Sequence, residues 1–289
     1  MFAKLVPVPL ILDGNRIRDQ IKAECLPRVK RLLAHAGRPP GLAVVLVGNN
    51  PASQVYVRGK TKTAGELGIY NETITLSADI STDELCSLIS SLNHREEIDG
   101  ILVQLPLPKQ IDEQRILLEI TPEKDADGFH PYNAGLLATG QPGLRPCTPA
   151  GVIEMLKRYE IPIVGRNAVV VGRSNIVGRP MAMLLLQQNA TVTICHSRTP
   201  DLAAITSEAE VLVVAAGRAG LIEPEHVAPG ATVIDVGTNA TPDGGLAGDV
   251  DPRVAEIAGA FSPVPGGVGP VTTALLLRHV TEVACASGG

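Results

Sequence analysis

The sequence is poor in aromatic residues, has no tryptophan and contains few cysteines. Aromatic residues make up 2% of its 289 residues, so Val, Leu, Ile and Ala must fill the interior, which suits a parallel sheet covered by helices. The cysteines are odd in number, scattered and without a C-x-x-C pair, which argues against both a disulfide framework and a zinc site. We therefore expect a protein of the reducing cytoplasm with no metal. The five cysteines are Cys25, Cys86, Cys147, Cys195 and Cys285.

Long apolar runs and basic blocks are also missing. No apolar run approaches the roughly 18 residues of a membrane span, and the stretch 5–12 is too short and too proline-broken for a signal peptide. The net charge of −5 is spread along the chain, which makes nucleic-acid binding improbable. An apolar content of 45% over 289 residues is ample for two cores. These features predict a soluble two-domain protein that binds neither nucleic acid nor a membrane.

The first half of the sequence alternates between strand and helix patterns. Asp13 and Ser53 are expected to cap two of the helices, and Ser-Thr-Asp-Glu opens a third at Ser81. Residues 121–147 are rich in Pro, Gly and Asp, which is typical of a passage between domains. We expect strands over 42–47, 69–76 and 99–105, and helices over 14–35, 53–67, 81–93 and 148–159.

The stretch from Val169 to Met181 ends an apolar run in a glycine turn and then becomes helical. Its strand is all β-branched, as a strand buried on both faces should be, and Gly172 lets the chain turn. The first N–H groups of the helix, which runs through Leu186, point back at the turn and favour an anion such as phosphate. The spacing departs from G-x-G-x-x-G, because Ser174 replaces the second glycine and Gly178 comes late. A tight turn without a ligand is the alternative.

A second strand, 191–195, ends in His196-Ser197-Arg198, where folds of this kind place the residue that contacts the cofactor ribose. An acid there would bind the free 2′-hydroxyl of NAD, and none is present. Arg198 with Ser197, helped by Arg173, offers charge and hydrogen bonds to a 2′-phosphate. This pattern indicates NADP, and the alternative is that both arginines are solvated surface residues. Further strands at 211–215 and 232–236 fit a parallel sheet with right-handed crossovers.

Tyr56 and Lys60 stand four residues apart near the start of the helix predicted over 53–67. Their side chains share one face, close to the carboxyl edge of the strand over 42–47, where ligands of α/β sheets gather. A basic helix that merely faces water would give the same pattern, because Arg58 also lies here.

Three other places could carry chemistry or have a structural role. Gln104 ends an apolar strand and must find hydrogen-bond partners if it is buried, although the adjacent loop could supply them. Asp127 precedes a glycine, which is common for a turn residue. The glycine-rich loop over 263–270 allows close approach of backbone to a ligand, or simply a turn.

Six separate stretches, in order along nearly the whole chain, resemble one family. It is the bifunctional methylenetetrahydrofolate dehydrogenase/methenyltetrahydrofolate cyclohydrolase family of the bacterial FolD type. Six matches in the right order are not expected by chance, so the resemblance outweighs the structural alternatives for Tyr56 and Lys60. The stretches are 51–58 with Lys60, 100–108, 122–129, 146–151, 171–180 and 263–270.

The resemblance implies a two-domain α/β enzyme with its active site in the cleft. An N-terminal α/β catalytic domain would cover residues 1–147, with the final helix, within 271–289, packing back on it. A doubly wound, Rossmann-type NADP-binding domain would cover 148–270. The family likeness further implies a cytoplasmic homodimer formed through the cofactor domains.

Residue roles follow from the resemblance position by position. Lys60 is similar to the catalytic lysine, Tyr56 to the residue that packs on the folate, and Gln104 to the partner of the lysine. Asp127 is similar to the carboxylate that grips the pterin. The implied cofactor contacts are Gly172, Arg173, Ser174, Ser197, Arg198 and Thr238. The implied folate contacts are Tyr56, Lys60, Val103, Gln104, Leu105, Asp127, Pro265, Gly266, Gly267, Val268 and Gly269.

The implied chemistry has two steps. NADP accepts a hydride from 5,10-methylenetetrahydrofolate, and water then opens the methenyl product to 10-formyltetrahydrofolate. The second step needs a base, and Lys60 can serve only as the neutral amine, although lysine is ordinarily protonated.

Two positions depart from the family pattern. Thr238 stands where isoleucine is common, and Gly59 replaces an asparagine before the lysine. A mid-helix glycine costs about 1 kcal/mol against Ala, which affects how firmly the lysine is placed. The alternatives to this family are a shikimate dehydrogenase-like NADP enzyme and a non-catalytic NADP-binding protein.

Overall fold

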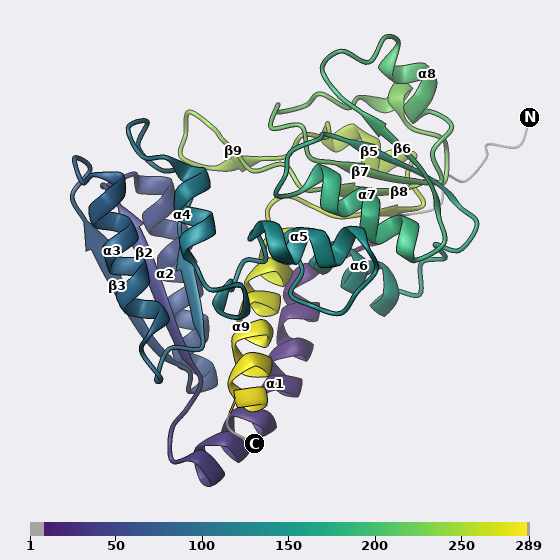
Figure 1. Ribbon diagram of the computed structural model, residues 1–289. Helices are drawn as coiled ribbons and strands as arrows, with labels where there is room; N and C mark the ends of the chain where they lie inside the picture. The colour runs from purple at the N-terminus through teal and green to yellow at the C-terminus, as the bar shows by residue number, and fades with distance from the viewer. Residues whose placement is uncertain (1–8, 288–289) are drawn as a thin grey trace, which may run out of the picture. The chain divides into compact units, whose positions relative to one another are not determined.

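The computed structural model describes residues 9–287, which form two compact units (Figure 1). The six-stranded unit, named for its sheet, contains residues 9–18 and Thr148–Thr272. The three-stranded unit contains Asp19–Cys147 and residues 273–287. Each unit has its own parallel sheet with helices, which confirms the predicted α/β fold class.

The three-stranded sheet has the order β3-β2-β4, with every pair parallel. The central strand β2 reads Gly-Leu-Ala-Val-Val-Leu-Val and is buried along its whole length, so both of its faces are apolar. On one face Val45 packs with Leu85 and Ile89 of α3 in a single apolar core. The elements are β2 (Gly41–Val47), α2 (Pro51–Leu67), β3 (Tyr70–Leu76), α3 (Thr82–Asn93), β4 (Gly100–Val103), α4 (Glu113–Glu119) and α5 (Pro131–Ala138).

Helix capping in this sequence is correctly predicted at two of three places. Asp13 Oδ1 accepts from the backbone N–H of Asn15 at 2.8 Å, and Ser81 forms a capping box with Glu84. The prediction that Ser53 caps α2 is wrong. Asn50 Oδ1 accepts from the N–H of Ser53 at 3.2 Å, so Asn50 is the cap and Ser53 lies within the helix.

The six-stranded sheet has the order β1-β11-β8-β7-β5-β6 and is parallel throughout. Strand β5 lies between β6 and β7, so the chain winds outward in both directions from it. This is the predicted doubly wound arrangement, and it places a ligand crevice at the carboxyl ends of β5 and β7. The strands are β1 (Leu10–Ile11), β5 (Asn167–Val171), β6 (Thr191–Cys195), β7 (Val211–Val214), β8 (Thr232–Asp235) and β11 (Ala260–Phe261).

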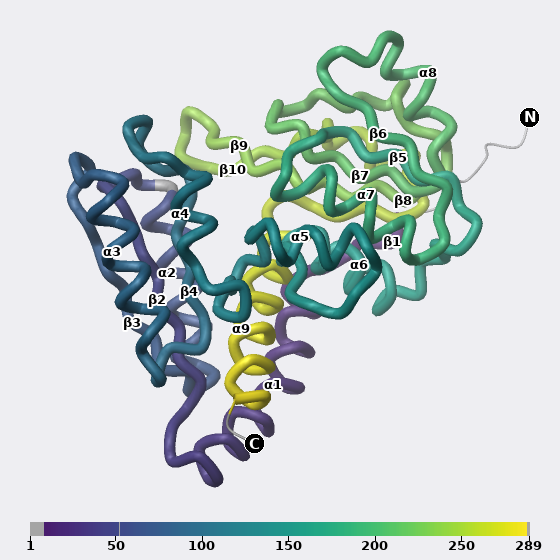
Figure 2. Tube along the Cα trace, viewed as in Figure 1, coloured from purple at the N-terminus to yellow at the C-terminus, as the bar shows by residue number. Residues whose placement is uncertain are grey.

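Several shorter elements complete the six-stranded unit. A two-stranded antiparallel ribbon of β9 and β10 leaves the carboxyl end of β8, and Figure 2 shows it as a hairpin. The helix expected from Val271 begins earlier, at Val268, because the ring of Pro270 is tolerated in a first turn. The elements are α6 (Cys147–Arg158), α7 (Gly178–Gln187), α8 (Leu202–Thr206), β9 (Asn239–Ala240) and β10 (Leu246–Ala247).

Helices α1 (Gly14–Ala36) and α9 (Val268–Ser287) each contribute residues to both units. Within the three-stranded unit α9 packs closely on β4, because a Cβ built at Gly100 would lie 2.6 Å from Cγ2 of Val280. Across residues 9–287, no helix is long and apolar enough to cross a membrane.

Candidate functional site

Lys60 and Gln104 meet in the three-stranded unit. Lys60 Nζ donates to Gln104 Oε1 at 3.1 Å, and Gln104 Nε2 donates to the carbonyl oxygen of Leu105 at 2.7 Å. The second bond fixes which end of the amide faces the lysine. The two residues come from α2 and from the position after β4, two elements that flank β2, and both side chains are partly exposed. A neutral amide, rather than a carboxylate, therefore holds the amine.

Asp127 lies close enough to Lys60 for their charges to interact. Burial raises the pKa of Asp127 above its ordinary value, the Lys60 charge lowers it, and the Asp125 charge raises it. The sequence left open that Asp127, which precedes Gly128, is only a turn residue, but the side chain that stabilises this turn is that of Asp125. Its carboxylate accepts backbone N–H groups from Gly128 at 3.1 Å and His130 at 2.7 Å. Asp127 is therefore not required for the turn, and its carboxylate can serve a ligand.

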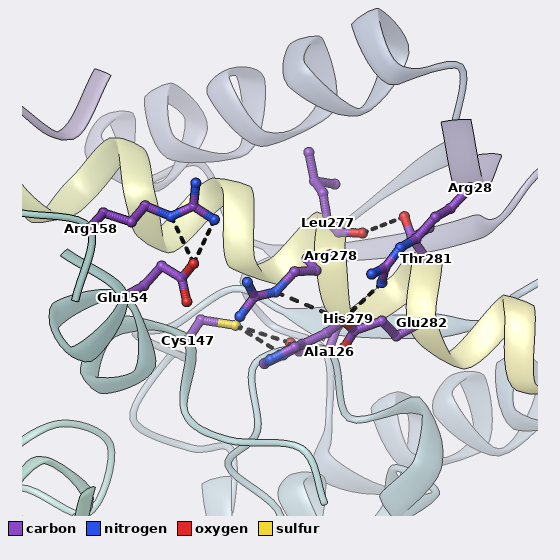
Figure 3. Close-up of polar contacts among 10 residues, drawn as sticks. All are labelled: Arg28, Ala126, Cys147, Glu154, Arg158, Leu277, Arg278, His279, Thr281 and Glu282. Atoms are coloured by element: carbon purple, nitrogen blue, oxygen red, sulfur yellow. Dashed lines mark hydrogen bonds and ion pairs between the residues drawn. The ribbon is translucent and has the colours of Figure 1, made fainter. Parts of the chain in front are cut away.

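A buried histidine, His279, contacts Ala126 and Cys147 (Figure 3), and Ala126 directly precedes Asp127. His279 of α9 places Nδ1 at 3.4 Å from the carbonyl oxygen of Ala126 and 3.5 Å from Sγ of Cys147. Cys147 donates its backbone N–H to the carbonyl oxygen of Asp127 at 3.1 Å. Burial lowers the pKa of His279 to about 4, so the imidazole is neutral at neutral pH. Burial also raises the pKa of the Cys147 thiol well above its ordinary value, so this cysteine is not a thiolate nucleophile.

The remaining predicted folate contacts of this unit lie near the same edge. Tyr56 is one helical turn before Lys60 on α2 and is 39% exposed, so its ring is available to a ligand. Val103 is the buried last residue of β4, and Leu105 follows Gln104. The structure thus brings together Lys60, Gln104 and Asp127 and places Tyr56 on the same helix face.

A pocket of about 480 Å³ opens in the six-stranded unit at the carboxyl ends of β5, β6 and β7. This size suits a small ligand or part of a cofactor. The turn after β5 needs glycine, because φ at Gly172 is +129° and an added Cβ would lie 2.2 Å from the oxygen of Ala215. The lining includes Gly172, Arg173, Ser174, His196, Ser197, Thr199, Ala215, Ala216 and Arg218.

The N–H groups at the start of α7 were expected to be free to bind an anion, and two of them are not. Ser174 Oγ accepts from the N–H of Val177 at 3.1 Å and of Gly178 at 3.3 Å, so the protein itself uses both donors. The late glycine has a packing role. A Cβ at Gly178 would lie 2.3 Å from the oxygen of Gly172, which explains how the helix approaches the strand so closely.

The turn after β6 is held by its own residues. The N–H of His196 donates to Oγ1 of Thr199 at 2.8 Å, and the N–H of Arg198 donates to Nδ1 of His196 at 3.2 Å. Ser197 lines the pocket beside Arg173, as the phosphate hypothesis requires. Arg198 and Thr238 are exposed and lie outside the pocket lining, so their cofactor contacts stay predictions.

The glycine-rich loop belongs to the six-stranded unit and packs on the start of α1. The N–H of Gly14 donates to the oxygen of Gly266 at 2.8 Å, and the N–H of Gly267 donates to that of Pro263. Close backbone contact is one reason for the glycines, because a Cβ at Gly267 would lie 2.5 Å from the Pro263 oxygen. Pro265 follows a cis peptide bond, and Val268 and Gly269 belong to the first turn of α9. Folate contacts of these residues stay a prediction.

Comparison with known proteins decides the family. Residues 12–127 match the family description "Tetrahydrofolate dehydrogenase/cyclohydrolase, catalytic domain", and residues 146–287 match "Tetrahydrofolate dehydrogenase/cyclohydrolase, NAD(P)-binding domain". The chain belongs to the tetrahydrofolate dehydrogenase/cyclohydrolase family. This confirms the resemblance read from the six sequence stretches and supports it over the shikimate dehydrogenase-like alternative.

Relatives in this family are similar over nearly their whole length. The bifunctional protein FolD of Solibacter usitatus is 58% identical, with 96% of this chain and 98% of the relative covered. The crystal structure of the Campylobacter jejuni FolD enzyme has a TM-score of 0.93 at 46% identity, covering 96% of this chain and 99% of that one. The Trypanosoma brucei enzyme, solved with NADP cofactor and an inhibitor, has a TM-score of 0.92 at 39% identity, with 97% and 98% covered.

Sequence reasoning missed pocket residues that follow β7. Ala216 and Arg218 line the pocket after β7, and His196, which was not among the predicted contacts, lines it after β6. The signal was present, because the rule that ligands bind where strand order reverses applies to both strands beside the switch, β5 and β7. His279 carried no such signal, because it lies far from Asp127 in the sequence. The part of the chain that the structure describes contains no group of three or more His, Cys, Asp or Glu that could hold a metal ion.

Proposed function

We propose that the protein oxidises 5,10-methylenetetrahydrofolate with NADP and hydrolyses the methenyl product to 10-formyltetrahydrofolate. The observation that carries the proposal is the 3.1 Å hydrogen bond between Lys60 and Gln104, with Asp127 within electrostatic reach, in a chain of this family. NADP supplies the hydride acceptor when it is bound. The protein's own groups must orient the folate, exclude water from the first reaction and admit it to the second.

The residues of the three-stranded unit fit the hydrolytic step. Water adds through oxygen to the methenyl carbon, and its proton passes to the amine of Lys60. The hydroxyl of this adduct then releases its proton as its oxygen becomes the formyl carbonyl, the bond from that carbon to N5 of the folate breaks, N5 takes up a proton, and the formyl group stays on N10. Gln104 accepts a hydrogen bond from the amine at 3.1 Å and so holds it in place for this proton transfer. The Asp127 carboxylate is suited to hydrogen-bond the N–H groups of the pterin ring.

The pocket at β5, β6 and β7 fits NADP. The glycine turn lets the backbone approach a ligand, Arg173 and Arg218 supply positive charge, and Ser197 supplies a hydroxyl. Guanidinium and hydroxyl groups are suitable partners for a 2′-phosphate. Glycine at the turn and the two arginines on the lining therefore support NADP at this place.

A split between the two activities tests the assignment of Lys60. Lys60→Met removes the base and should abolish hydrolysis of the methenyl compound, measured without NADP. NADP binding, which rests on the other unit, should persist, and the dehydrogenase reaction should survive better because hydride transfer needs orientation more than a base. Lys62→Met, two residues on and exposed, is the matched control. A folded Lys60→Met protein with wild-type hydrolysis would contradict the assignment.

We also propose a cytoplasmic homodimer formed through the six-stranded units. Strand β6 is an edge of the sheet and leaves apolar side chains exposed, with Ile194 41% and Leu186 on α7 64% accessible. Exposed edges and apolar patches of this kind are typical of subunit contacts. Light scattering should give twice the chain mass, and Ile194→Lys should shift it toward one chain. A monomeric wild-type protein would contradict the dimer, and cell fractionation tests the compartment.

A further inference from the structure

A fully buried carboxylate lies beneath the cofactor pocket. Asp249, with no exposed surface, accepts backbone N–H groups from three consecutive residues of the loop after β7. Oδ2 accepts from Ala216 at 2.7 Å and from Gly217 at 2.8 Å, and Oδ1 accepts from Arg218 at 2.9 Å. The side-chain amide of Asn239 donates to Oδ1 at 2.8 Å. Four short bonds thus converge on one side chain.

The loop that Asp249 holds is the one whose residues Ala216 and Arg218 line the pocket. All three loop residues are exposed, and Gly217 has a φ of +67°, so these bonds, together with one from the N–H of Leu221 to the oxygen of Arg218 at 3.3 Å, fix the loop backbone. Hydrogen bonds to an ionised acceptor are about twice as strong as neutral ones. They also commit the three N–H groups to the protein. The loop is left with the guanidinium of Arg218 as its positive group for a ligand.

Asp249 is itself held in place at the end of β8. Its backbone N–H donates to Oδ1 of Asp235 at 3.0 Å, and Asp235 also accepts from the N–H groups of Gly237 and Val250. A Cβ at Gly237 would lie 2.5 Å from the Asp249 carboxylate, so the space around the acid is filled. The acid therefore links the ends of two adjacent strands, β7 and β8, beside the pocket.

We propose that Asp249 is a positioning residue for NADP, which fixes the β7 loop so that Arg218 faces the cofactor. The proposal rests on the assignment of this pocket to NADP. It concerns affinity for the cofactor, because Asp249 lies in the six-stranded unit, whereas the groups assigned to hydrolysis lie in the other.

The test is Asp249→Asn in the full-length protein, with kinetics for each substrate. The amide turns NH2 toward N–H donors, so at least one donor loses its acceptor. We expect KM for NADP to rise at least about tenfold, the size of a lost buried hydrogen bond. KM for methylenetetrahydrofolate and hydrolysis of the methenyl compound without NADP should stay within twofold of wild type. Arg218→Ala should raise KM for NADP in the same way, and the exposed Asp243→Asn is the matched control.

A milder variant covers the case in which Asp249→Asn does not fold. Asn239→Ala removes only one donor to the carboxylate and should raise KM for NADP by a few-fold with hydrolysis unchanged. A folded Asp249→Asn protein with the wild-type KM for NADP overturns the proposal, and so does an unfolded one paired with a wild-type KM in Asn239→Ala. A wild-type protein that does not bind NADP overturns the pocket assignment itself. If the wild-type protein binds NADP but Arg173→Ala leaves KM for NADP unchanged, the assignment of NADP to this pocket is also overturned.

Discussion

The buried imidazole of His279 should make the stability of the protein depend on pH in a way that one substitution removes. Burial lowers its pKa from 6.5 to about 4, and the charges of Arg278 and Arg145 act in the same direction. Between these values the unfolded chain binds a proton that the folded chain does not. The stabilisation is therefore present above pH 6.5 and is lost as the pH falls through 6.5 toward 4.

The size of the effect follows from the shift. The difference of 2.5 between 6.5 and about 4 corresponds to about 3.5 kcal/mol at about 1.4 kcal/mol per pKa unit, and about 3 kcal/mol of this is lost by pH 4, where the folded-state pKa is just reached. Because His279 is only 6% exposed, solvent screening reduces this free-energy difference little. On going from pH 7 to pH 4 the wild-type protein should lose about 3 kcal/mol more unfolding free energy than His279→Gln, whose amide does not titrate.

Urea unfolding followed by circular dichroism at pH 7, 5.5 and 4 measures the difference between the two proteins. The comparison must be between variant and wild type, because Asp235 acts in the opposite sense. Burial raises the pKa of Asp235 from 3.8 to about 6, so its contribution to stability is present below 3.8 and is lost as the pH rises toward 6. Parallel pH dependence in wild type and His279→Gln would refute the account of the buried histidine.

Three further predictions concern the two sites. Gln104→Glu replaces the amide that accepts the Lys60 hydrogen bond with a carboxylate, which would form an ion pair with the protonated amine, so hydrolysis of the methenyl compound should fall at least tenfold at pH 7; an unchanged rate would show that the amide is not needed for the step. Ser197→Asp should repel the 2′-phosphate and move the ratio of kcat/KM toward NAD; NAD rates equal to NADP rates already in the wild type would contradict the phosphate site. Gly59→Ala should stabilise α2 by up to about 1 kcal/mol in urea unfolding, because a Cβ there meets nothing within 4 Å. Gly65→Ala is the control, because an added Cβ at Gly65, on the same helix, also meets nothing within 4 Å. A Gly59→Ala protein that is less stable than the wild type would contradict the prediction.

The sequence was sufficient for features that depend on local pattern. Strand β6 has the predicted bounds, and the buried strands β2 and β5 lie where apolar runs end in glycine. The cap at Asn50 was also within reach, because Pro51 favours the first helical position and so marks the residue before it. Strands β1 and β11 were not predicted, because two residues carry no periodicity.

The sites were predictable only in part, and the missing part is long-range. The spacing of Tyr56 and Lys60 showed a shared helix face, yet the partner at Gln104 came from the family resemblance. Asp249 and His279 act on residues 31 or more positions away. Such contacts depend on strand order and on the return of the last helix, which no local pattern in the chain encodes.

Absorbance of the methenyl product tests the central claim most directly. Purified protein is mixed with 5,10-methylenetetrahydrofolate and NADP, and in a second cuvette with the methenyl compound alone. We expect methenyl absorbance and NADPH to form in the first cuvette. In the second, the methenyl signal should decay faster than in buffer, without any cofactor. No NADPH from methylenetetrahydrofolate, together with methenyl decay at the buffer rate, would contradict the proposal.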